Sequence, residues 1–510
     1  MAGQAETIAE LLAAGADDAP ALEAPGGPAP LTYGGLRALA HRVVGELNAA
    51  GIGRGDRVAI VLPNGPEAAT AFMAIGAGAT AAPLNPAYKA EEFEFYLTDL
   101  QARLLVVAAG EDTPALAVAA KLGVPVARLH PTPETGAGDF RLDLPRNGGA
   151  AAQGGPAEPD DVALVLHTSG TTSRPKIVPL AQRNVCASAR HIRESLAFTA
   201  ADRGLNIMPL FHIHGLIAGI LAPLSAGGAV SCTPGFNALK FFGWMSEARP
   251  TWYTAVPTMH QAILGRASRA RDVIAANPLR FLRSSSSSLP PQVMAELEAT
   301  FGAPVIEAYG MTEAAHQMAS NPLPPRARHP GSVGVAAGPE IRIIDRDGRP
   351  LPAGETGEIA IRGPNVMSGY EANPGANAEA FTADGFFRTG DQGTLDPEGY
   401  VRITGRLKEI INRGGEKISP REVDEVLMDH PAVSQCVAFA MPHDKLGEEV
   451  AAAIVLREGQ TVAEAELRRF ASERLASFKV PAKILVLDEI PKGATGKLQR
   501  IGLAAKLGLG

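Results

Sequence analysis

Cysteine is scarce in this sequence, and its scarcity excludes two common ways of stabilising a fold. The 510 residues include only Cys186, Cys232 and Cys436, which lie far apart along the chain. Such spacing predicts neither a disulfide framework nor a clustered zinc site. We therefore expect the protein to work in a reducing compartment, the cytoplasm.

The sequence also lacks the features of secretion and of membrane insertion. Its start has neither the basic region nor the apolar core of a signal peptide, and residues 1–22 are instead typical of an amphipathic helix. Residues 215–239 form the longest uncharged stretch, but Pro223, Gly227 and Pro234 interrupt it. The pattern predicts a buried helix followed by a strand, and no membrane span.

An excess of basic residues is missing too. Lysine and arginine number 47 against 54 aspartates and glutamates, so the formal net charge is −7 at pH 7. A protein that binds nucleic acid broadly would have the opposite balance. A chain of 510 residues is long enough to form two or more domains, each with its own core.

The most informative segment is residues 167–176, HTSGTTSRPK, directly after the apolar run at residues 162–166. The run predicts a buried strand, and open α/β sheets bind ligands where such strands end. The hydroxyls, the glycine and Lys176 are suited to binding a polyphosphate. Because Lys176 follows Pro175, the segment does not match the Walker motif and indicates a different nucleotide-binding loop.

A second glycine pattern has the wrong context for a nicotinamide cofactor. Gly76, Gly78 and Ala81 fit the dinucleotide fingerprint G-x-G-x-x-A. That fingerprint should follow a strand and begin a helix, whereas here it ends the apolar segment at residues 68–75, which we interpret as a helix. We therefore predict that these glycines allow close packing of a helix.

Five further motifs follow the loop in a fixed order: PLFHIHG (residues 209–215), EAYGMTE (307–313), FRTGD (387–391), GRLKEIINRGGEKISPREVD (405–424) and PKGATGKLQR (491–500). Together with HTSGTTSRPK they resemble the motifs of the acyl-CoA synthetase, adenylation-domain and luciferase superfamily of adenylate-forming enzymes. The resemblance extends over nearly the whole chain from about residue 31. No single motif would suffice for it.

The resemblance implies an α/β fold with a large N-terminal domain of two α/β subdomains plus a small β unit. Residues 341–362 alternate in polarity around two turns and independently predict a small antiparallel unit. Residues 131–159, rich in glycine, proline and alanine, predict an exposed connection. We expect an AMP-binding N-terminal domain over residues 1–405 and a smaller, mobile α+β C-terminal domain over residues 406–510.

The implied activity is that of an acid-thiol ligase, an AMP-forming acyl-CoA synthetase that uses ATP, Mg²⁺ and coenzyme A as co-substrate. A carboxylate would attack the α-phosphorus of ATP to give an acyl adenylate and pyrophosphate. The two anions repel each other by several kcal/mol at contact distance, so positive groups have to offset that repulsion.

The resemblance also assigns the ATP contacts. The β- and γ-phosphates would lie against HTSGTTSRPK, and the α-phosphate and Mg²⁺ against EAYGMTE, with Glu313 as metal ligand. Asp391 of FRTGD would bind the ribose with the help of Arg406. The adenine would lie between the serines at 286–287 and residues 307–309. The expected ATP-binding residues are Thr168, Ser169, Gly170, Thr171, Thr172, Lys176, Ser286, Ser287, Glu307, Ala308, Tyr309, Thr312, Asp391 and Arg406.

The expected catalytic residues are Lys497, His212, Thr312 and Glu313. By resemblance, Lys497 contacts the carboxylate and phosphate oxygens during adenylation, and removing one such donor typically costs about 3–4 kcal/mol. Taken alone, its segment would be a surface turn.

The resemblance further implies a rotation of the small domain about a hinge at Lys408, after which coenzyme A takes the place of Lys497. Gly414 and Gly415 would then lie close to the pantetheine tunnel.

The acid itself is less certain from sequence, but the acyl pocket is unusually polar. His214, Ser285 and His316 are the candidates for holding a second carboxylate, since imidazole and hydroxyl groups both donate hydrogen bonds. The motif set is most similar to the oxalate-CoA ligase branch. The malonate branch has an arginine where this chain has Ala308, and Ile177 stands where the family usually has glycine.

Several alternatives remain open at this point. The acid could be aromatic, as coumarate is, or of medium chain length. The fold could also serve a non-catalytic nucleotide-binding sensor, or an adenylation domain that loads a carrier protein. The sequence indicates neither nucleic-acid binding nor an oligomeric state.

Overall fold

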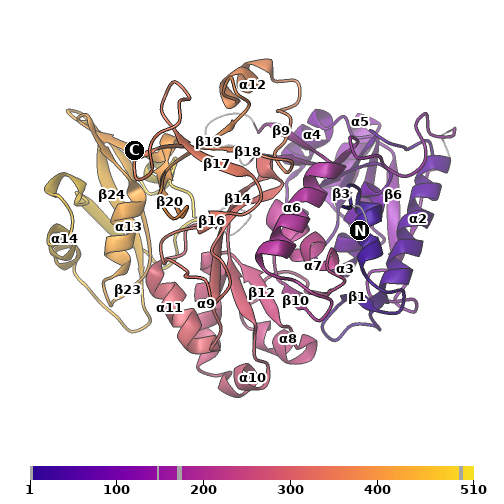
Figure 1. Cartoon of the computed structure of the whole chain (residues 1–510), viewed down its shortest axis with the longest axis horizontal. Helices are drawn as coiled ribbons and strands as arrows, with labels where there is room; N and C mark the ends of the chain where they lie inside the picture. Colours follow the sequence, from indigo (N-terminus) through magenta and orange to yellow (C-terminus); the bar gives the residue numbers. More distant parts are fainter. Residues whose placement is uncertain (1–3, 146–148, 169–174, 493–497, 510) are drawn as a thin grey trace.

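The computed structural model describes residues 4–145, 149–168, 175–492 and 498–509. Within these residues the strands form four sheets. Figure 1 shows the chain running from an N-terminal α/β region, through a second α/β region and a small β unit, to a separate C-terminal part. The predicted α/β class with a large N-terminal and a smaller C-terminal part is confirmed.

The first sheet is mostly parallel and has seven strands. Parallel strands buried on both faces are near-continuous apolar runs, as in the segment that was predicted as a strand before the phosphate loop. The order across the sheet is β7 (Phe140–Asp143), β6 (Val126–Pro131), β5 (Leu104–Ala108), β3 (Arg57–Val61), β4 (Thr80–Pro83), β8 (Val162–His167) and β9 (Ile177–Ala181).

The second sheet has nine strands, and its central strands are parallel. Their carboxyl ends all lie along one edge, next to the corresponding edge of the first sheet. The order is β16 (Val335–Ala336), β15 (His316–Ser320), β14 (Val305–Met311), β13 (Phe281–Ser284), β12 (Trp252–Ala255), β10 (Arg203–Asn206), β11 (Ala229–Cys232), β1 (Pro20–Glu23) and β2 (Leu31–Thr32).

Helices with large buried faces lie between these two sheets. Helix α6 (Gln182–Ser195) contacts both β8 and β15, and α3 (Pro66–Gly76) contacts β4 and β11. A π-helix (His214–Leu221), continued by α7 (Ala222–Leu224), is buried beside them, as the sequence predicted for this uncharged stretch. Because one hydrophobic core includes side chains from both sheets, the two subdomains are held rigidly against each other.

The outer faces are covered by the remaining helices of the large part. They are α2 (Tyr33–Ala49), α4 (Ala90–Asp99), α5 (Pro114–Leu122), α8 (Phe241–Ala248), α9 (Pro257–Ala267), α10 (Arg271–Ala276) and α11 (Pro291–Phe301). None of the helices within the described residues combines the length and the apolar character that a membrane span requires.

The predicted small β unit is present and larger than expected. Its four antiparallel strands are β17 (Glu340–Ile344), β18 (Gly357–Arg362), β19 (Phe387–Leu395) and β20 (Val401–Arg406), with α12 (Pro374–Ala380) between the middle two. Strand β20 ends at Arg406, and a 3₁₀ turn (Leu407–Glu409) then leads into the last sheet. This turn lies at the predicted hinge.

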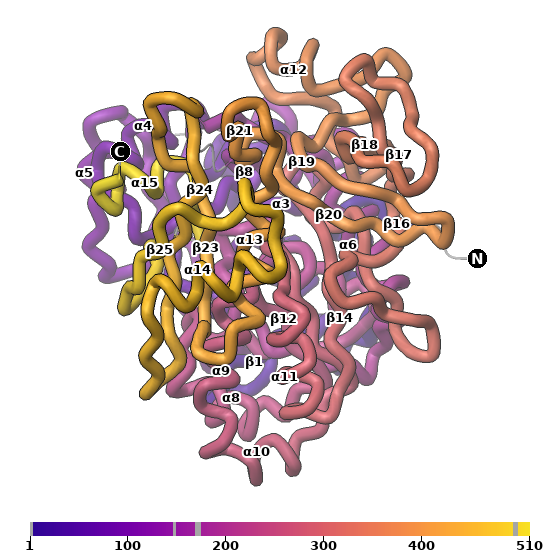
Figure 2. The backbone as a smooth tube through the Cα atoms, turned by 90° about the vertical axis from the view of Figure 1, so that its left-hand side faces the viewer, coloured from indigo at the N-terminus to yellow at the C-terminus, as the bar shows by residue number. Residues whose placement is uncertain are grey.

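The C-terminal part forms its own five-stranded sheet of β22 (Glu416–Ile418), β21 (Ile411–Arg413), β24 (Gly447–Leu456), β23 (Val433–His443) and β25 (Lys483–Val486). Helices α13 (Pro420–Met428), α14 (Glu464–Ser472) and α15 (Leu503–Lys506) accompany it. Figure 2 shows this part in front of the second sheet. Polar contacts join it to the large part, including a 2.9 Å hydrogen bond from Gln261 to the carbonyl of Ser434.

Two sequence interpretations need correction. The N-terminal helix is only α1 (Ile8–Leu11), capped by Thr7 and Glu10, and a short 3₁₀ turn follows it; strand β1 occupies the rest of the predicted helix. The connection at residues 131–159 contains β7, whose register pairs His130 with Arg141. Strand pairing, with the distant β11 for β1 and with the preceding β6 for β7, determines the local structure more than helix propensity or turn composition does.

The glycine pattern at residues 76–81 serves packing, as predicted. Gly76 ends α3, and a Cβ atom there would lie 3.0 Å from the side chain of Ile8. At Gly78 a Cβ atom would lie 2.7 Å from the methyl groups of Val44. Larger residues would push the helices apart.

Candidate active site

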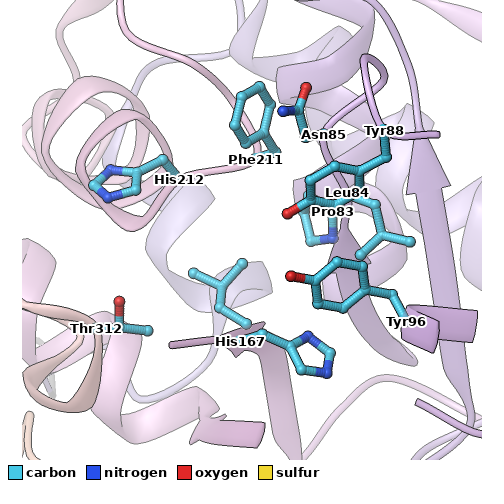
Figure 3. Close-up of a pocket in the computed structure, with 10 residues that line it drawn as sticks. Pro83, Leu84, Asn85, Tyr88, Tyr96, His167, Phe211, His212 and Thr312 are labelled. Atoms are coloured by element: carbon cyan, nitrogen blue, oxygen red, sulfur yellow. The ribbon is translucent and has the colours of Figure 1, made fainter. Parts of the chain in front are cut away.

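The predicted site residues gather where the parallel strands of both sheets end. A cavity lies at this junction, lined by Pro83, Leu84, Asn85, Tyr88, Tyr96, Leu166, His167, Phe211, His212 and Thr312. Figure 3 shows the hydroxyl groups of Tyr88 and Tyr96 pointing into it from one side, with the His212 ring opposite. The carboxyl edge of an open α/β sheet is the usual place for a ligand site.

The two ends of the phosphate loop are joined to each other. The amide of Thr168 donates to the carbonyl of Lys176 at 2.9 Å, and the amide of Lys176 donates to the Thr168 hydroxyl at 3.1 Å. The strands on either side form an antiparallel pair in which His167 opposes Ile177. Ser169, Gly170, Thr171 and Thr172, four of the predicted phosphate contacts, lie outside the described residues.

Tyr370 connects the phosphate loop to the predicted metal ligand. The ammonium group of Lys176 lies 4.3 Å from the centre of the Tyr370 ring, a distance typical of a cation–π contact. On its other side, the Tyr370 hydroxyl donates to the carboxylate of Glu313 at 2.9 Å. Burial raises the pKa of Glu313, and the Tyr370 bond favours the ionised form. A cation and an anion from distant motifs are thus held on one aromatic side chain.

Glu313 fits the role of a magnesium ligand. Within the described ranges, no group of three or more His, Cys, Asp or Glu side chains is arranged to hold a metal ion. Magnesium commonly takes only one or two protein carboxylates and completes its coordination with phosphate oxygens and water. Thr312 and Glu313 begin the short 3₁₀ turn after β14, so the Glu313 carboxylate lies at the strand end where ATP is expected.

The predicted ribose contacts form a compact ionic group. The Nε of Arg406 donates to Asp391 at 2.9 Å, and the Tyr309 hydroxyl donates to the other carboxylate oxygen. The charge of Asp391 raises the pKa of Arg406, while burial and the same carboxylate raise the pKa of Tyr309. The pair holds β19 and β20 in register at the end of the small β unit, where Asp391 opposes Arg406.

Glu307 holds the C-terminal end of the loop that was predicted to contact the adenine. Its carboxylate accepts a hydrogen bond from the backbone amide of Leu289 at 3.1 Å, which fixes the far end of the segment that contains Ser286 and Ser287. Burial raises the pKa of Glu307 to about 7. Ser287 is exposed and Ser286 half-buried, so these two residues form the accessible surface of the loop.

The acyl end of the site contains two stacked imidazole rings. The rings of His214 and His316 lie 4.8 Å apart at 20° to each other. The Nδ1 atom of His214 lies 3.0 Å from the hydroxyl of Ser286, and its Nε2 atom lies 2.6 Å from that of Thr254. Both rings are buried. Two of the three residues predicted to hold a second carboxylate thus contact each other.

Ser285, by contrast, is directed away from the histidines. Its buried hydroxyl donates to the carbonyl of Ala308 at 2.9 Å, which joins β13 to β14. Ser286, which was predicted to contact the adenine, is the serine whose hydroxyl lies beside His214. Its φ of 74° is in the left-handed region and turns the chain sharply after β13. The hydroxyl of Ser285 is engaged by Ala308, and its role in holding a second carboxylate stays a prediction.

Close backbone approach explains the glycine of the YGMTE motif. A Cβ atom at Gly310 would lie 2.0 Å from the carbonyl oxygen of His316 on the neighbouring strand. His316 itself has a positive φ of 102°, and Ala315 one of 47°. Strained backbone of this kind clusters at functional sites, where the surroundings enforce it.

The residues predicted for the second half-reaction lie in the C-terminal part. Lys408 is exposed in the 3₁₀ turn that leads out of β20. Gly414 and Gly415 form the turn between β21 and β22, with φ values of 58° and 101° that favour glycine. Lys497, the predicted catalytic lysine, lies outside the described residues.

Several contributors escaped the sequence analysis. Tyr370 stands in no motif that we distinguished, and Thr254 lies inside an ordinary apolar strand. Arg283 was visible as a charge within the buried strand that precedes the serine run, but its contacts with His214 and Gln317 could not be read from the sequence. Ile177, the departure from the family pattern, is buried in the core around the first sheet, and its carbonyl accepts from the amide of Glu371.

Comparison with known proteins identifies the class. The family model of the AMP-binding enzyme matches residues 10–371, and that of the AMP-binding enzyme C-terminal domain matches residues 422–497. The chain belongs to the AMP-binding enzyme family, so the resemblance to adenylate-forming enzymes is confirmed.

Individual relatives cover almost the whole chain. A probable CoA ligase, CCL9, from Humulus lupulus is 48% identical over 479 residues, which span 92% of this chain and 90% of the relative. An oxalate–CoA ligase from Arabidopsis thaliana is 47% identical over 477 residues, 92% of each chain. Among solved structures, ATP-bound MatB from Rhodopseudomonas palustris is 33% identical, with 97% of each chain covered and a TM-score of 0.86.

Proposed function

We propose that this enzyme is an ATP-dependent ligase that joins oxalate, a short dicarboxylic acid, to coenzyme A. Two features support the reaction class: the family, and the meeting of four distant motifs at one sheet edge. The single observation that supports the acid is the acyl end itself, where His214, His316, Thr254 and Ser286 form a buried polar wall. A relative of nearly half identical sequence has oxalate–CoA ligase as its name.

The first half-reaction makes an acyl adenylate. A carboxylate oxygen of the acid forms a bond to the α-phosphorus of ATP, and the bond between the α- and β-phosphates breaks to release pyrophosphate. Lys176 would offset charge on the departing phosphates, and Asp391 would hold the ribose hydroxyls through hydrogen bonds. Magnesium supplies charge neutralisation when it binds with ATP, and Glu313 would be its protein ligand.

The second half-reaction makes the thioester. The sulfur of coenzyme A bonds to the adenylate carbonyl carbon, AMP departs, and the thiol proton is lost. We assign Lys497 to the first step and place Gly414 and Gly415 near the incoming thiol in the second. A rotation of residues 406–510 about Lys408 would exchange them, because the hinge follows directly on the end of β20.

An aromatic or medium-chain acid is a poorer fit for this wall. A ring or an alkyl chain against this wall would leave the Ser286 hydroxyl, the half-buried group beside His214, facing an apolar surface, which costs about 1–3 kcal/mol for an unsatisfied donor. A non-catalytic sensor is also disfavoured, since Lys176, Glu313, Asp391 and Arg406 are all retained at the site. Three buried, unpaired cysteines support the cytoplasm as the place of the reaction.

A product assay tests the proposal. Purified enzyme is incubated with ATP, Mg²⁺, coenzyme A and one acid at a time: oxalate, malonate, acetate, coumarate, benzoate or octanoate. AMP formation gives the rate, and mass spectrometry identifies the thioester. We expect oxalyl-CoA at the highest kcat/KM. A dominant coumaroyl-, benzoyl- or octanoyl-CoA product would overturn the choice of acid, and no AMP with any acid would overturn the ligase assignment.

A further inference from the structure

Arg283 is a fully buried arginine without an acidic partner in the described part of the chain. It lies in the middle of β13 with no exposed side-chain surface. Its Nη1 lies 3.2 Å from Nε2 of His214 and 3.5 Å from the hydroxyl of Thr254, and its Nη2 donates to Gln317 at 3.3 Å. Thr254 and Gln317 are uncharged, and a histidine ring that accepts a hydrogen bond from a guanidinium is the neutral imidazole.

A buried charge of this kind is expensive for a fold. Burial lowers the pKa of Arg283 to about 9, so the guanidinium still carries its proton at neutral pH. Its Nε atom has no hydrogen-bond partner among the described residues. Buried charges are normally paired, and breaking such a pair is strongly destabilising. The arrangement therefore leaves a positive charge whose counter-ion has to come from outside the described fold.

The contacts also determine which nitrogen of His214 carries the proton. A guanidinium can only donate hydrogen bonds, so Nε2 of His214 must accept from Arg283. A neutral imidazole with an unprotonated Nε2 carries its hydrogen on Nδ1, which then donates to Ser286. The orientation of Gln317 agrees, because its amide group donates to Ser195 and leaves the oxygen for Arg283.

The Ser286 hydroxyl is the accessible end of this chain of hydrogen bonds. Because it accepts from His214, its own hydrogen remains for an acceptor on the open side. Ser286 is half-buried, whereas Arg283 and His214 are fully buried, so the chain leads from the core to the acyl end of the site. A positive charge in low dielectric acts over several ångströms on an anion placed there.

We propose that Arg283 is the residue that determines specificity at the acyl end: its fixed charge, acting through His214 and Ser286, selects short acids that carry a second negative charge. Arg283 orients His214 and does not itself touch the reacting atoms. The inference rests on the proposed function and extends it, since it predicts which property of the acid is recognised. A neutral acid of the same size should bind without the electrostatic attraction to Arg283.

Oxamate provides the neutral comparison, because a carboxamide replaces one carboxylate of oxalate at nearly the same size. The test measures kcat/KM for AMP formation with each acid in wild type, Arg283→Gln and Arg283→Lys. Arg283→Gln keeps a hydrogen-bond donor and removes the charge. We expect it to lower kcat/KM for oxalate about 50-fold or more and that for oxamate less than about 5-fold. Arg283→Lys keeps the charge, and the preference for oxalate should survive in it.

Arg280→Gln is the matched control. Arg280 lies three residues earlier, just before the same strand, but pairs with Asp202 at 2.8 Å on the other side. Its replacement should change the two acids by the same factor. Circular dichroism and urea unfolding show whether each variant is folded. If Arg283→Gln does not fold, Arg283→Lys provides the test.

The outcomes separate the two proposals. If wild type makes oxalyl-CoA but Arg283→Gln lowers the rates with both acids equally, or if the lysine variant loses the preference as fully as the glutamine variant, the inference is wrong and the ligase assignment stands. If wild type makes no oxalyl-CoA, the proposed function fails and the inference fails with it.

The tautomer of His214 gives a second, independent readout. Nitrogen NMR of protein labelled in the histidine rings, with His214→Gln for assignment, should show His214 protonated on Nδ1 in wild type. In Arg283→Gln the signal should change toward a mixture of tautomers or the doubly protonated ring. An unchanged His214 signal would contradict the orienting role of Arg283.

Discussion

The two ends of the active site balance charge in opposite ways. At the nucleotide end, Arg406 has its partner in Asp391, and Lys176 and Glu313 face each other across Tyr370. At the acyl end, the hydrogen bonds of Arg283 to described residues go to the neutral groups of His214, Thr254 and Gln317. Among the described residues, the charges at the first end are paired, and the charge at the second end is not.

The difference teaches what each end demands of its ligand. The nucleotide end is already compensated, so it can position ATP through hydrogen bonds and leave phosphate charge to the loop and to magnesium. The acyl end lacks a negative charge that an acid with two carboxylates brings. This contrast predicts that changes at the nucleotide end affect all acids alike, whereas changes at the acyl end depend on the charge of the acid.

The largest effect is expected from Asp391→Asn, which removes the negative partner of Arg406. Truncating one partner of a hydrogen-bonded charge pair costs about 2–5 kcal/mol, so we expect kcat/KM for ATP to fall about 30- to 5,000-fold. The loss should be the same with oxalate and with any poorer acid, because the lesion lies at the nucleotide end.

Glu340→Gln is the control for Asp391→Asn, since Glu340 pairs with exposed arginines on the same small sheet. It should leave the steady-state rates unchanged. A loss in Asp391→Asn that differs tenfold between acids would contradict the separation of the two ends.

The next effect is on stability and concerns Glu307, which holds the loop of Ser286 and Ser287 through the amide of Leu289. Burial raises its pKa from 4.5 to about 7, so the folded state binds a proton that the unfolded state has already lost. Stability from this group is present below about pH 4.5 and is lost as pH rises through about 7, at a cost of about 3 kcal/mol.

Urea unfolding at several pH values measures this cost against Glu307→Gln, which cannot ionise. Between pH 5 and pH 8, wild type should lose about 2.5 kcal/mol of unfolding free energy relative to the variant. The exposed Glu379→Gln serves as the control for removing one carboxylate. A difference that stays constant with pH would show that Glu307 is not a buried acid.

A smaller effect is expected from His214→Gln, which acts at the acyl end. Glutamine can still contact Arg283 but cannot relay the hydrogen bond to Ser286 in the same geometry. We expect kcat/KM for oxalate to fall about 30-fold while the KM for ATP changes less than about twofold. His329→Gln, which removes a ring stacked on Tyr400, is the control. A rise in the KM for ATP by the same factor would contradict the claim that the two ends act separately.

The smallest effect should come from Tyr370→Phe. The ring that contacts Lys176 remains, but the hydrogen bond to Glu313 is lost, which costs about 1 kcal/mol or roughly fivefold in kcat. Because that bond favours ionised Glu313, its loss should move the acidic limb of the pH–rate profile to higher pH. Tyr400→Phe, whose hydroxyl donates to Ala327, should leave the profile in place.

The fold could be predicted well from sequence, and the residues predicted to bind the nucleotide could be named from it, because the information for both is local. The run before the phosphate loop is apolar throughout and became β8, and the polarity pattern at residues 341–362 became β17 and β18. The nucleotide contacts lie within short contiguous motifs such as YGMTE and RTGD. A contiguous motif can be recognised in the sequence without knowledge of the residues that it contacts in the fold.

The acyl end could be predicted only in part, because its contacts join residues from different strands. His214 and His316 were named from composition, but neither the serine that faces them nor Arg283 could be chosen without the turn at Ser286 and the neighbours of β13. The N-terminal helix was predicted too long, since the pairing of β1 with β11 is invisible locally.

A competition experiment tests the central claim most directly. Wild-type enzyme receives oxalate, oxamate, acetate and coumarate together at equal concentration, with ATP, Mg²⁺ and coenzyme A, and mass spectrometry counts the thioesters formed early in the reaction. Their ratios equal the ratios of kcat/KM. The account predicts that oxalyl-CoA exceeds each other thioester at least about 50-fold. Comparable amounts of the oxalate and oxamate products, or an excess of coumaroyl-CoA, would contradict it.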